Sequence, residues 1–146
     1  MLTRFFLLFA MLFIATHAYS LTAEEAKAIA VGEGDTRIEA LRASIAGADD
    51  KTAQFIQALA DDAVKVVGDK PLIVRDGKGV DPVTGAEATL PDTAEDIMNN
   101  NRMRGEIDAA LASLKLLSPD ATVRREAVKT LQGDVDESKL PLLDKA

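Results

Sequence analysis

A long amphipathic helix is predicted in the last third of the chain. It begins near residues 99–101 and continues to about Leu117. Ser118 and Pro119 end it, because the residue before a proline avoids helical backbone angles. Its apolar residues recur at intervals of three and four and form one stripe, made up of Met103, Ile107, Ala110, Leu111, Leu114 and Leu117. Such a stripe must be buried against another element, so the chain is expected to pack helix against helix.

Three shorter helices are expected before this one. Thr22 and Glu25 have the spacing of a capping box and predict a helix that ends near Val31. Asp35 is expected to cap a second helix, and Asp49 with Asp50 opens a third. Apolar residues mark their buried faces, at Ile38, Leu41 and Ile45 in the second helix and at Phe55, Ile56 and Leu59 in the third. The tight connection between the second and third helices predicts a helical hairpin.

The pattern changes to that of strands over residues 63–90. Val64, Val66 and Val67 precede a turn signal at residues 68–71, and a second apolar run at residues 72–74 precedes another at residues 76–79. We interpret this segment as a small insertion of one or two β-hairpins. Because two strands alone are marginally stable in water, the insertion is expected to lean on the helices.

Two more helical segments and a weak internal repeat complete the predicted fold. A helix is expected from Pro119 or Asp120 to Gly133, and a last one over residues 138–143. Arg37 with Ala40 and Leu41, and Arg124 with Ala127 and Val128, are similarly spaced and each followed by a glycine. The sequence therefore predicts a mainly α fold of HEAT-like helical hairpins, a fragment of an α-solenoid, with a small β-hairpin insertion around residues 63–90.

The first twenty residues are predicted to be a secretory signal peptide. Arg4 precedes an apolar run over residues 5–15, and small residues at Ala18 and Ser20 place the cleavage site near Ser20. An uncleaved membrane anchor is the alternative, but a spanning helix needs about 20 apolar residues. The protein is therefore expected to be exported to the periplasm, with residues 21–146 forming one domain.

Composition removes several classes of chemistry. The chain has no cysteine, and its one histidine, His17, lies in the predicted signal peptide. Thiol catalysis, zinc–thiolate sites and serine–histidine triads are therefore not expected. A net charge of −7 argues against nucleic acid and anionic membranes as partners. We expect a non-enzyme without catalytic, cofactor-binding or metal-binding residues.

The most distinctive polar cluster precedes and begins the long helix. The simplest interpretation of residues 99–104 is a helix cap followed by solvated arginines. Arg102 and Arg104 point about 200° apart on a helix and so form no joint clamp. The alternative is that one of them pairs with an acidic loop of the insertion or of a partner subunit. The candidate interaction surface is therefore Asn100, Asn101, Arg102 and Arg104.

Two other patterns are weaker. Residues 76–81 are distantly like a calcium loop, but they lack alternating oxygen ligands and carry Lys78 in the middle, so we interpret them as a turn. The pairs Asp49-Asp50 and Asp61-Asp62 contain the carboxylates that glycoside hydrolysis requires. Acidic residues at helix starts and in loops are far commoner, and no aromatic platform accompanies them.

Several segments resemble a known family. Residues 100–104 (NNRMR), 111–117, 118–120 (SPD), 123–124 and 140–143 (LPLL) are similar to the N-terminal periplasmic extension of the urea ABC-transporter permease, which belongs to the branched-chain amino-acid-type transporters. Residues 34–38, 75–77 and 83–85 fit the same extension. The resemblance covers residues 32–143, without the transmembrane permease domain.

The resemblance implies a scaffold or accessory role in urea uptake, with a second permease, ATPases and a periplasmic urea-binding protein as partners. It implies either a truncated permease or an extension that stands alone, and it assigns no catalytic or binding residue. The alternative functions are a free-standing periplasmic HEAT-like adapter unrelated to urea and, from another class, a carboxylate-based hydrolase. Any contact with the membrane is expected only through a partner or an uncleaved signal segment.

Overall fold

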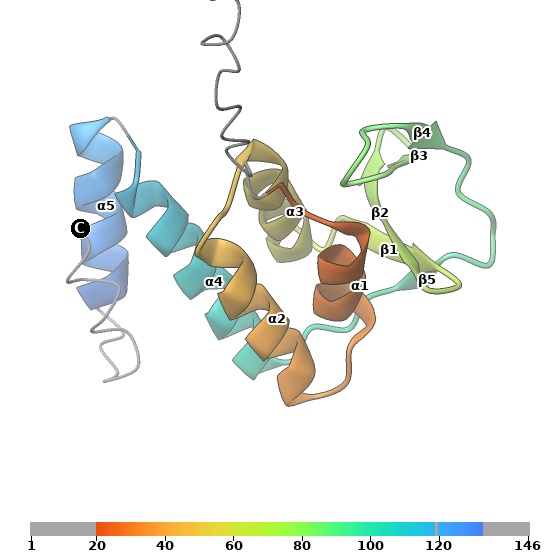
Figure 1. Ribbon diagram of the computed structural model, residues 1–146, viewed down its shortest axis with the longest axis horizontal. Coiled ribbons are helices and arrows are strands. Elements are labelled where there is room, and N and C mark those ends of the chain that lie inside the picture. The colour runs from red at the N-terminus through yellow and green to blue at the C-terminus, as the bar shows by residue number, and fades with distance from the viewer. Residues whose placement is uncertain (1–19, 119, 133–146) are drawn as a thin grey trace, which may run out of the picture.

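A computed structural model describes residues 20–118 and 120–132 of the 146-residue chain. The helices of this part of the chain form one layer, and a small sheet lies beside it, next to the first helix (Figure 1). In chain order the helices are α1 (Ala23–Val31), α2 (Asp35–Ile45), α3 (Asp50–Ala60), α4 (Asn101–Leu116) and α5 (Ala121–Gln132). Residues 1–19 of the predicted signal peptide and the predicted segment 138–143 lie outside the described residues.

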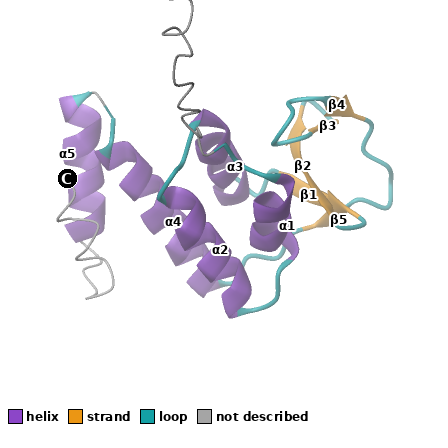
Figure 2. Cartoon of the chain, viewed as in Figure 1, coloured by secondary structure: helices purple, strands orange, loops and turns teal. Residues whose placement is uncertain are grey.

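The sheet is antiparallel and is built between α3 and α4 (Figure 2). Its order is β4-β3-β2-β1-β5, so the last strand returns to pair with the first. Val64 faces Ile73 in the β1–β2 register, and Lys65 faces Asp96 in the β1–β5 register. The strands are β1 (Val64–Val67), β2 (Lys70–Arg75), β3 (Lys78–Val80), β4 (Glu87–Ala88) and β5 (Glu95–Asp96).

Local sequence signals account for most helix starts. The predicted capping box of α1 is confirmed, because the Thr22 hydroxyl accepts from the Glu25 amide and the Glu25 carboxylate accepts from the Thr22 amide. Asp49 caps α3 by accepting from the Thr52 amide at 2.9 Å. The prediction that Asp35 caps α2 is wrong, since the cap position is Gly34, whose positive φ of 49° suits a residue without a side chain.

Helix α4 occupies the centre of the helical layer. It packs against α2, α3 and α5, and α1 packs against α2 and β2. The predicted hairpin of α2 and α3 is therefore wrong, because α2 packs on α1 and α4, and α3 packs on α4 and β2, rather than on each other. The main core joins helices and sheet through residues that are almost fully buried, among them Ile29, Leu41, Phe55, Ile56, Leu59, Val64, Ile73 and Ile107.

The prediction of a mainly α, HEAT-like solenoid is wrong, since the chain forms an α/β fold. In a solenoid, each helix pair buries its apolar face against the next pair along the chain. Here α1 packs on β2 and α3 on both β2 and α4, so the sheet takes the place of a neighbouring repeat. The predicted insertion was also too short, because β5 at residues 95–96 completes the sheet beyond residue 90.

The apolar residues of α4 pack into two separate clusters instead of one. Met103, Ile107 and Ala110 join the main core as predicted, with Leu111 and Leu114 partly buried against it. Leu117 does not belong to the stripe, because it is 70% exposed just past the helix end. Ala112 and Leu116 instead form a second, small cluster with Ala127 of α5. A helix that is covered on two sides buries residues outside a single stripe.

The face of the sheet that points away from the main core is covered by the chain between β4 and β5. Leu72 alternates with Ile73 and is 4% exposed, although it lies outside the main core. A methyl group placed on Gly79 would lie 2.9 Å from Leu72 and 3.2 Å from Leu90. Leu72 and Leu90 therefore pack directly over the Gly79 backbone, which leaves no room there for a side chain.

Gly79→Ala is expected to lower the free energy of unfolding by about 1–3 kcal/mol, because the added methyl group overpacks this contact. Gly105→Ala is the matched control, since Gly105 lies within α4 with no atom near its Cβ position. There the substitution is expected to raise the free energy of unfolding by about 0.5–1 kcal/mol. Urea unfolding followed by circular dichroism measures both, and equal effects of the two substitutions would contradict the packing described.

Candidate functional site

The four residues of the predicted interaction surface lie at the start of α4. Asn100 is the N-cap, and its side-chain oxygen accepts from the Met103 amide at 2.8 Å. Asn101 is the first helical residue and is exposed. The simpler interpretation of Asn100 as a helix cap is therefore confirmed.

Arg102 and Arg104 bind two different acidic residues of the same chain. Arg102 pairs with Asp35 at the start of α2. Arg104 reaches both carboxylate oxygens of Asp62, each at 3.1 Å, at the end of α3. Neither partner belongs to the predicted insertion of residues 63–90. Each pair is half-exposed or more, so each contributes only about 0–1 kcal/mol.

Sequence reasoning missed a polar junction directly beside these residues. Arg37 of α2 donates to the Ile29 carbonyl of α1 at 2.8 Å, to the Met98 carbonyl at 3.1 Å and to the Asn99 side-chain oxygen at 2.7 Å. Asn99 in turn donates to the Leu59 carbonyl near the end of α3 at 3.2 Å. Arg37 and Asn99 therefore connect the ends of α1 and α3 to α2 and to the segment before α4.

Burial lowers the pKa of Arg37 from its ordinary value. Gly32 at the end of α1 lies beside the Arg37 side chain. A side chain there would lie 2.4 Å from the Ala28 carbonyl oxygen and 3.2 Å from Cγ of Arg37. The Ala28 backbone therefore excludes a side chain at this position, and Arg37 passes close to it.

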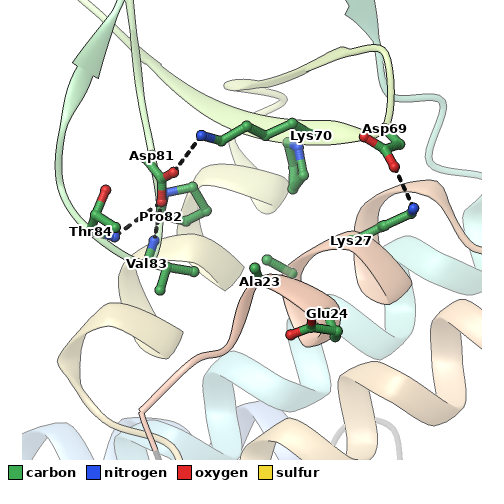
Figure 3. A pocket seen from close by; sticks show the side chains of 11 residues that line it. Ala23, Glu24, Lys27, Asp69, Lys70, Asp81, Pro82, Val83 and Thr84 are labelled. Carbon is green, nitrogen blue, oxygen red and sulfur yellow. Dashed lines mark hydrogen bonds and ion pairs between the residues drawn. The ribbon is translucent and has the colours of Figure 1, made fainter.

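A hollow with polar and apolar walls lies elsewhere, between α1 and the sheet (Figure 3). We call it the α1–sheet groove. It has a volume of about 430 Å³, and its walls come from the start of α1, the β1–β2 turn with the start of β2, and the loop after β3. Its apolar lining consists of Ala23, Ala26, Pro71, Pro82 and Val83. None of these residues was predicted to contribute to a site.

Two ion pairs lie at the groove (Figure 3). Lys27 of α1 pairs with Asp69 in the β1–β2 turn, and Lys70 of β2 pairs with Asp81 at 2.8 Å. The hydrogen bond and charge of Lys27 lower the pKa of Asp69. The Asp81 side chain is only 13% exposed and also accepts from the amides of Val83 and Thr84, at 2.9 and 3.0 Å.

Asp81 is held in its charged form. Burial alone raises the pKa of Asp81, but the hydrogen bond from Lys70, the two amide hydrogen bonds and the Lys70 charge outweigh burial and lower it to about 2. This carboxylate ties the loop of residues 81–84 to β2, so the wall of the groove is fixed by charge-assisted hydrogen bonds.

The weaker candidates have ordinary structural roles. Asp76 and Gly77 form the β2–β3 turn, as predicted, both with positive φ. Asp49 and Asp61 lie at opposite ends of α3, about 18 Å apart along the helix, whereas paired catalytic carboxylates lie about 5–9.5 Å apart. Burial raises the pKa of Asp49, but hydrogen bonds from the Thr52 amide and hydroxyl outweigh it and lower the pKa overall.

Comparisons with protein-family models, with curated proteins and with solved structures find no match for this chain. The family resemblance seen in the sequence therefore stays a prediction. Among the described helices, none has both the length and the apolar character needed to cross a bilayer. The described residues also contain no cluster of three or more acidic or histidine side chains suited to a metal ion.

Asn99→Ala is expected to lower the free energy of unfolding by about 1–3 kcal/mol, because the Leu59 carbonyl loses its side-chain donor and the Arg37 guanidinium loses one of its acceptors. Asn101→Ala, two residues away on the exposed start of α4, is the control and should change stability by less than about 0.5 kcal/mol. Thermal and urea unfolding provide the measurement. A loss as small for Asn99 as for Asn101 would show that the junction does not hold the helices together.

Asp81→Asn is expected to alter the pH dependence of stability. The folded pKa of about 2 lies below the ordinary 3.8, so Asp81 stabilises the fold above pH 3.8, and this contribution is lost as the pH falls toward 2. The substitution should therefore lower the free energy of unfolding by about 1–2 kcal/mol at neutral pH. It should also reduce the loss of stability that the wild type shows as the pH falls from 3.8 to about 2. Urea unfolding at several pH values tests this, with exposed Asp108→Asn in α4 as control; parallel pH profiles for Asp81→Asn and the wild type would refute it.

Proposed function

We propose that this protein is an exported, non-catalytic accessory domain that associates with subunits of a urea-type ABC importer. The observation that carries the proposal is the resemblance of residues 32–143 to the periplasmic extension of the urea permease. Its segment at residues 100–104 caps α4 through Asn100 and binds Asp62 through Arg104. Its segment at residues 83–85 contributes Val83 and Thr84 to the wall of the α1–sheet groove.

The roles of the acidic residues support association rather than catalysis. Asp49 holds the start of α3, Asp62 is bound by Arg104, and Asp81 is bound by Lys70 and two amides. A catalytic carboxylate has to receive or deliver a proton near the working pH. The pKa of Asp81, at about 2, and the lowered pKa of Asp49 are opposite to what a general acid needs.

Affinity capture tests the proposal. The tagged chain is produced together with the two permeases, the ATPases and the binding protein of a urea importer, and the complexes are extracted in mild detergent. We expect at least one urea-importer subunit to be retained. The subunits of a branched-chain amino-acid importer, handled identically, serve as the control and should not be retained.

Uptake provides the second measurement. Deleting the chain is expected to reduce the uptake of labelled urea and to leave the uptake of labelled leucine unchanged. Capture of neither importer, with normal urea uptake after deletion, would refute the proposal. Equal capture of both importers would instead support an adapter unrelated to urea.

A further inference from the structure

We infer that the α1–sheet groove binds an extended segment of a partner protein that carries an apolar side chain close to a lysine or arginine. The inference rests on the proposed function, because it names the surface and the chemistry of the association. Three properties of the groove indicate the chemistry of the bound segment: the residues that line the groove, the rigidity of its walls and the charge around it.

The size and lining of the groove suit an apolar side chain. Its volume of about 430 Å³ lies within the range of small binding sites, about 300–1,000 Å³. Its apolar lining comes from three separate parts of the chain: α1, β2 and the loop after β3. A leucine-sized group that enters here removes apolar surface from water on several sides at once.

The walls are held in place by contacts within the chain. Lys70 of β2 pairs with Asp81, whose side chain is 13% exposed, and Lys51 of α3 donates to the Val83 carbonyl at 2.6 Å, whereas the exposed Lys27–Asp69 pair adds little. The loop closes on itself as well, because the Gly85 amide donates to the Asp81 carbonyl at 2.8 Å. Since the groove is already formed without a partner, binding requires little further ordering of this chain.

The charges around the groove select a cation. Three carboxylates line it, those of Glu24, Asp69 and Asp81, against two ammonium groups, those of Lys27 and Lys70. Both lysines already pair with an aspartate, whereas Glu24 is exposed and no hydrogen bond or ion pair is seen for it among the described residues. The remaining charge is therefore negative and lies beside Ala23 (Figure 3).

The open side of the groove favours a polypeptide over an enclosed small molecule. The side chains of Lys27, Asp69 and Lys70 are 51%, 72% and 59% exposed, so the groove is in contact with solvent along this rim. In an extended chain, residues two apart point to the same side and lie about 7 Å from each other. One side chain can then occupy the apolar lining while a basic side chain two residues away meets Glu24.

Three labelled peptides of equal length test the inference. They carry central Leu-Ser-Lys, Leu-Ser-Glu or Ser-Ser-Lys sequences between glycine–serine flanks, and fluorescence anisotropy measures their Kd for the purified chain. We expect the Leu-Ser-Lys peptide to bind about tenfold more tightly than either of the others. Equal affinity for the first two would refute the charge argument, and equal affinity for the first and third would refute the apolar one.

Matched substitutions locate the binding site. Ala23→Phe fills the groove from an exposed position at the start of α1, and Ala121→Phe makes the same change at the exposed start of α5. Glu24→Gln removes the surplus negative charge at the groove. Glu39→Gln, on the exposed face of α2, is its control because it removes one negative charge elsewhere. The two groove substitutions should weaken binding of the Leu-Ser-Lys peptide about tenfold, while the controls stay within about twofold of the wild type.

The outcomes separate this inference from the proposed function. Retention of urea-importer subunits by Ala23→Phe at the wild-type level would refute the groove as the docking site and leave the association intact. If the Leu-Ser-Lys peptide binds, Ala23→Phe abolishes this binding, and no importer subunit is captured, the groove is supported as a peptide-binding site and the association with the importer is not. Circular dichroism checks that both variants are folded. If Ala23→Phe and Ala121→Phe then lower the affinity for the Leu-Ser-Lys peptide equally, the site is refuted.

Discussion

The hydrogen bonds of Arg37 and Asn99 determine how the helical layer is assembled. The last turns of a helix leave carbonyl oxygens without partners inside the helix, and in a packed domain these oxygens need other donors. Arg37 supplies one to Ile29 near the end of α1, and Asn99 supplies one to Leu59 near the end of α3. Because Arg37 also binds Asn99, the ends of α1 and α3 and the start of α4 are joined at one point.

The β segment begins and ends beside this junction. The chain leaves α3 beside Asp62, which Arg104 of α4 binds, and it returns to Asn99 directly after β5. Ala63 also accepts a hydrogen bond from the Val74 amide at 2.7 Å, so β2 is tied to the point where the chain leaves the helices. With both ends of the β segment held at the start of α4, the sheet lies beside α1. The α1–sheet groove is the space between these two elements (Figure 3).

The polar cluster at residues 99–104 shows how a surface prediction changes once partners are known. From the sequence, Arg102 and Arg104 were candidates for contact with another subunit. In the fold they bind Asp35 and Asp62, which are more than 40 residues away along the chain. A sequence reveals that a charged side chain is present, but the distant residue that meets it depends on the packing of the whole layer. The interaction surface on these four residues therefore stays a prediction, and the groove provides a second one.

Much of the local structure was predictable from single segments. The capping box at Thr22, the cap at Asp49, the strands around residues 64–80 and the helix from residue 101 depend on residues a few positions apart, and their patterns were correctly interpreted. The strands β4 and β5 have two residues each and carry no alternation of apolar and polar residues that could reveal them. The groove could not be predicted, because its residues come from three segments with no pattern in common.

The sequence by itself determined where the helices and the strands β1 to β3 begin and which of their faces are apolar, since these properties depend on short-range spacing and on backbone preferences. The tertiary structure alone decided that α4 lies between α2 and α3, that a sheet covers α1 in place of a further helical pair, and that the loop after β3 faces α1. The reason is that an apolar stripe is compatible with many partners. Which partner it meets depends on where distant polar groups, such as Arg37 and Asn99, find their hydrogen bonds.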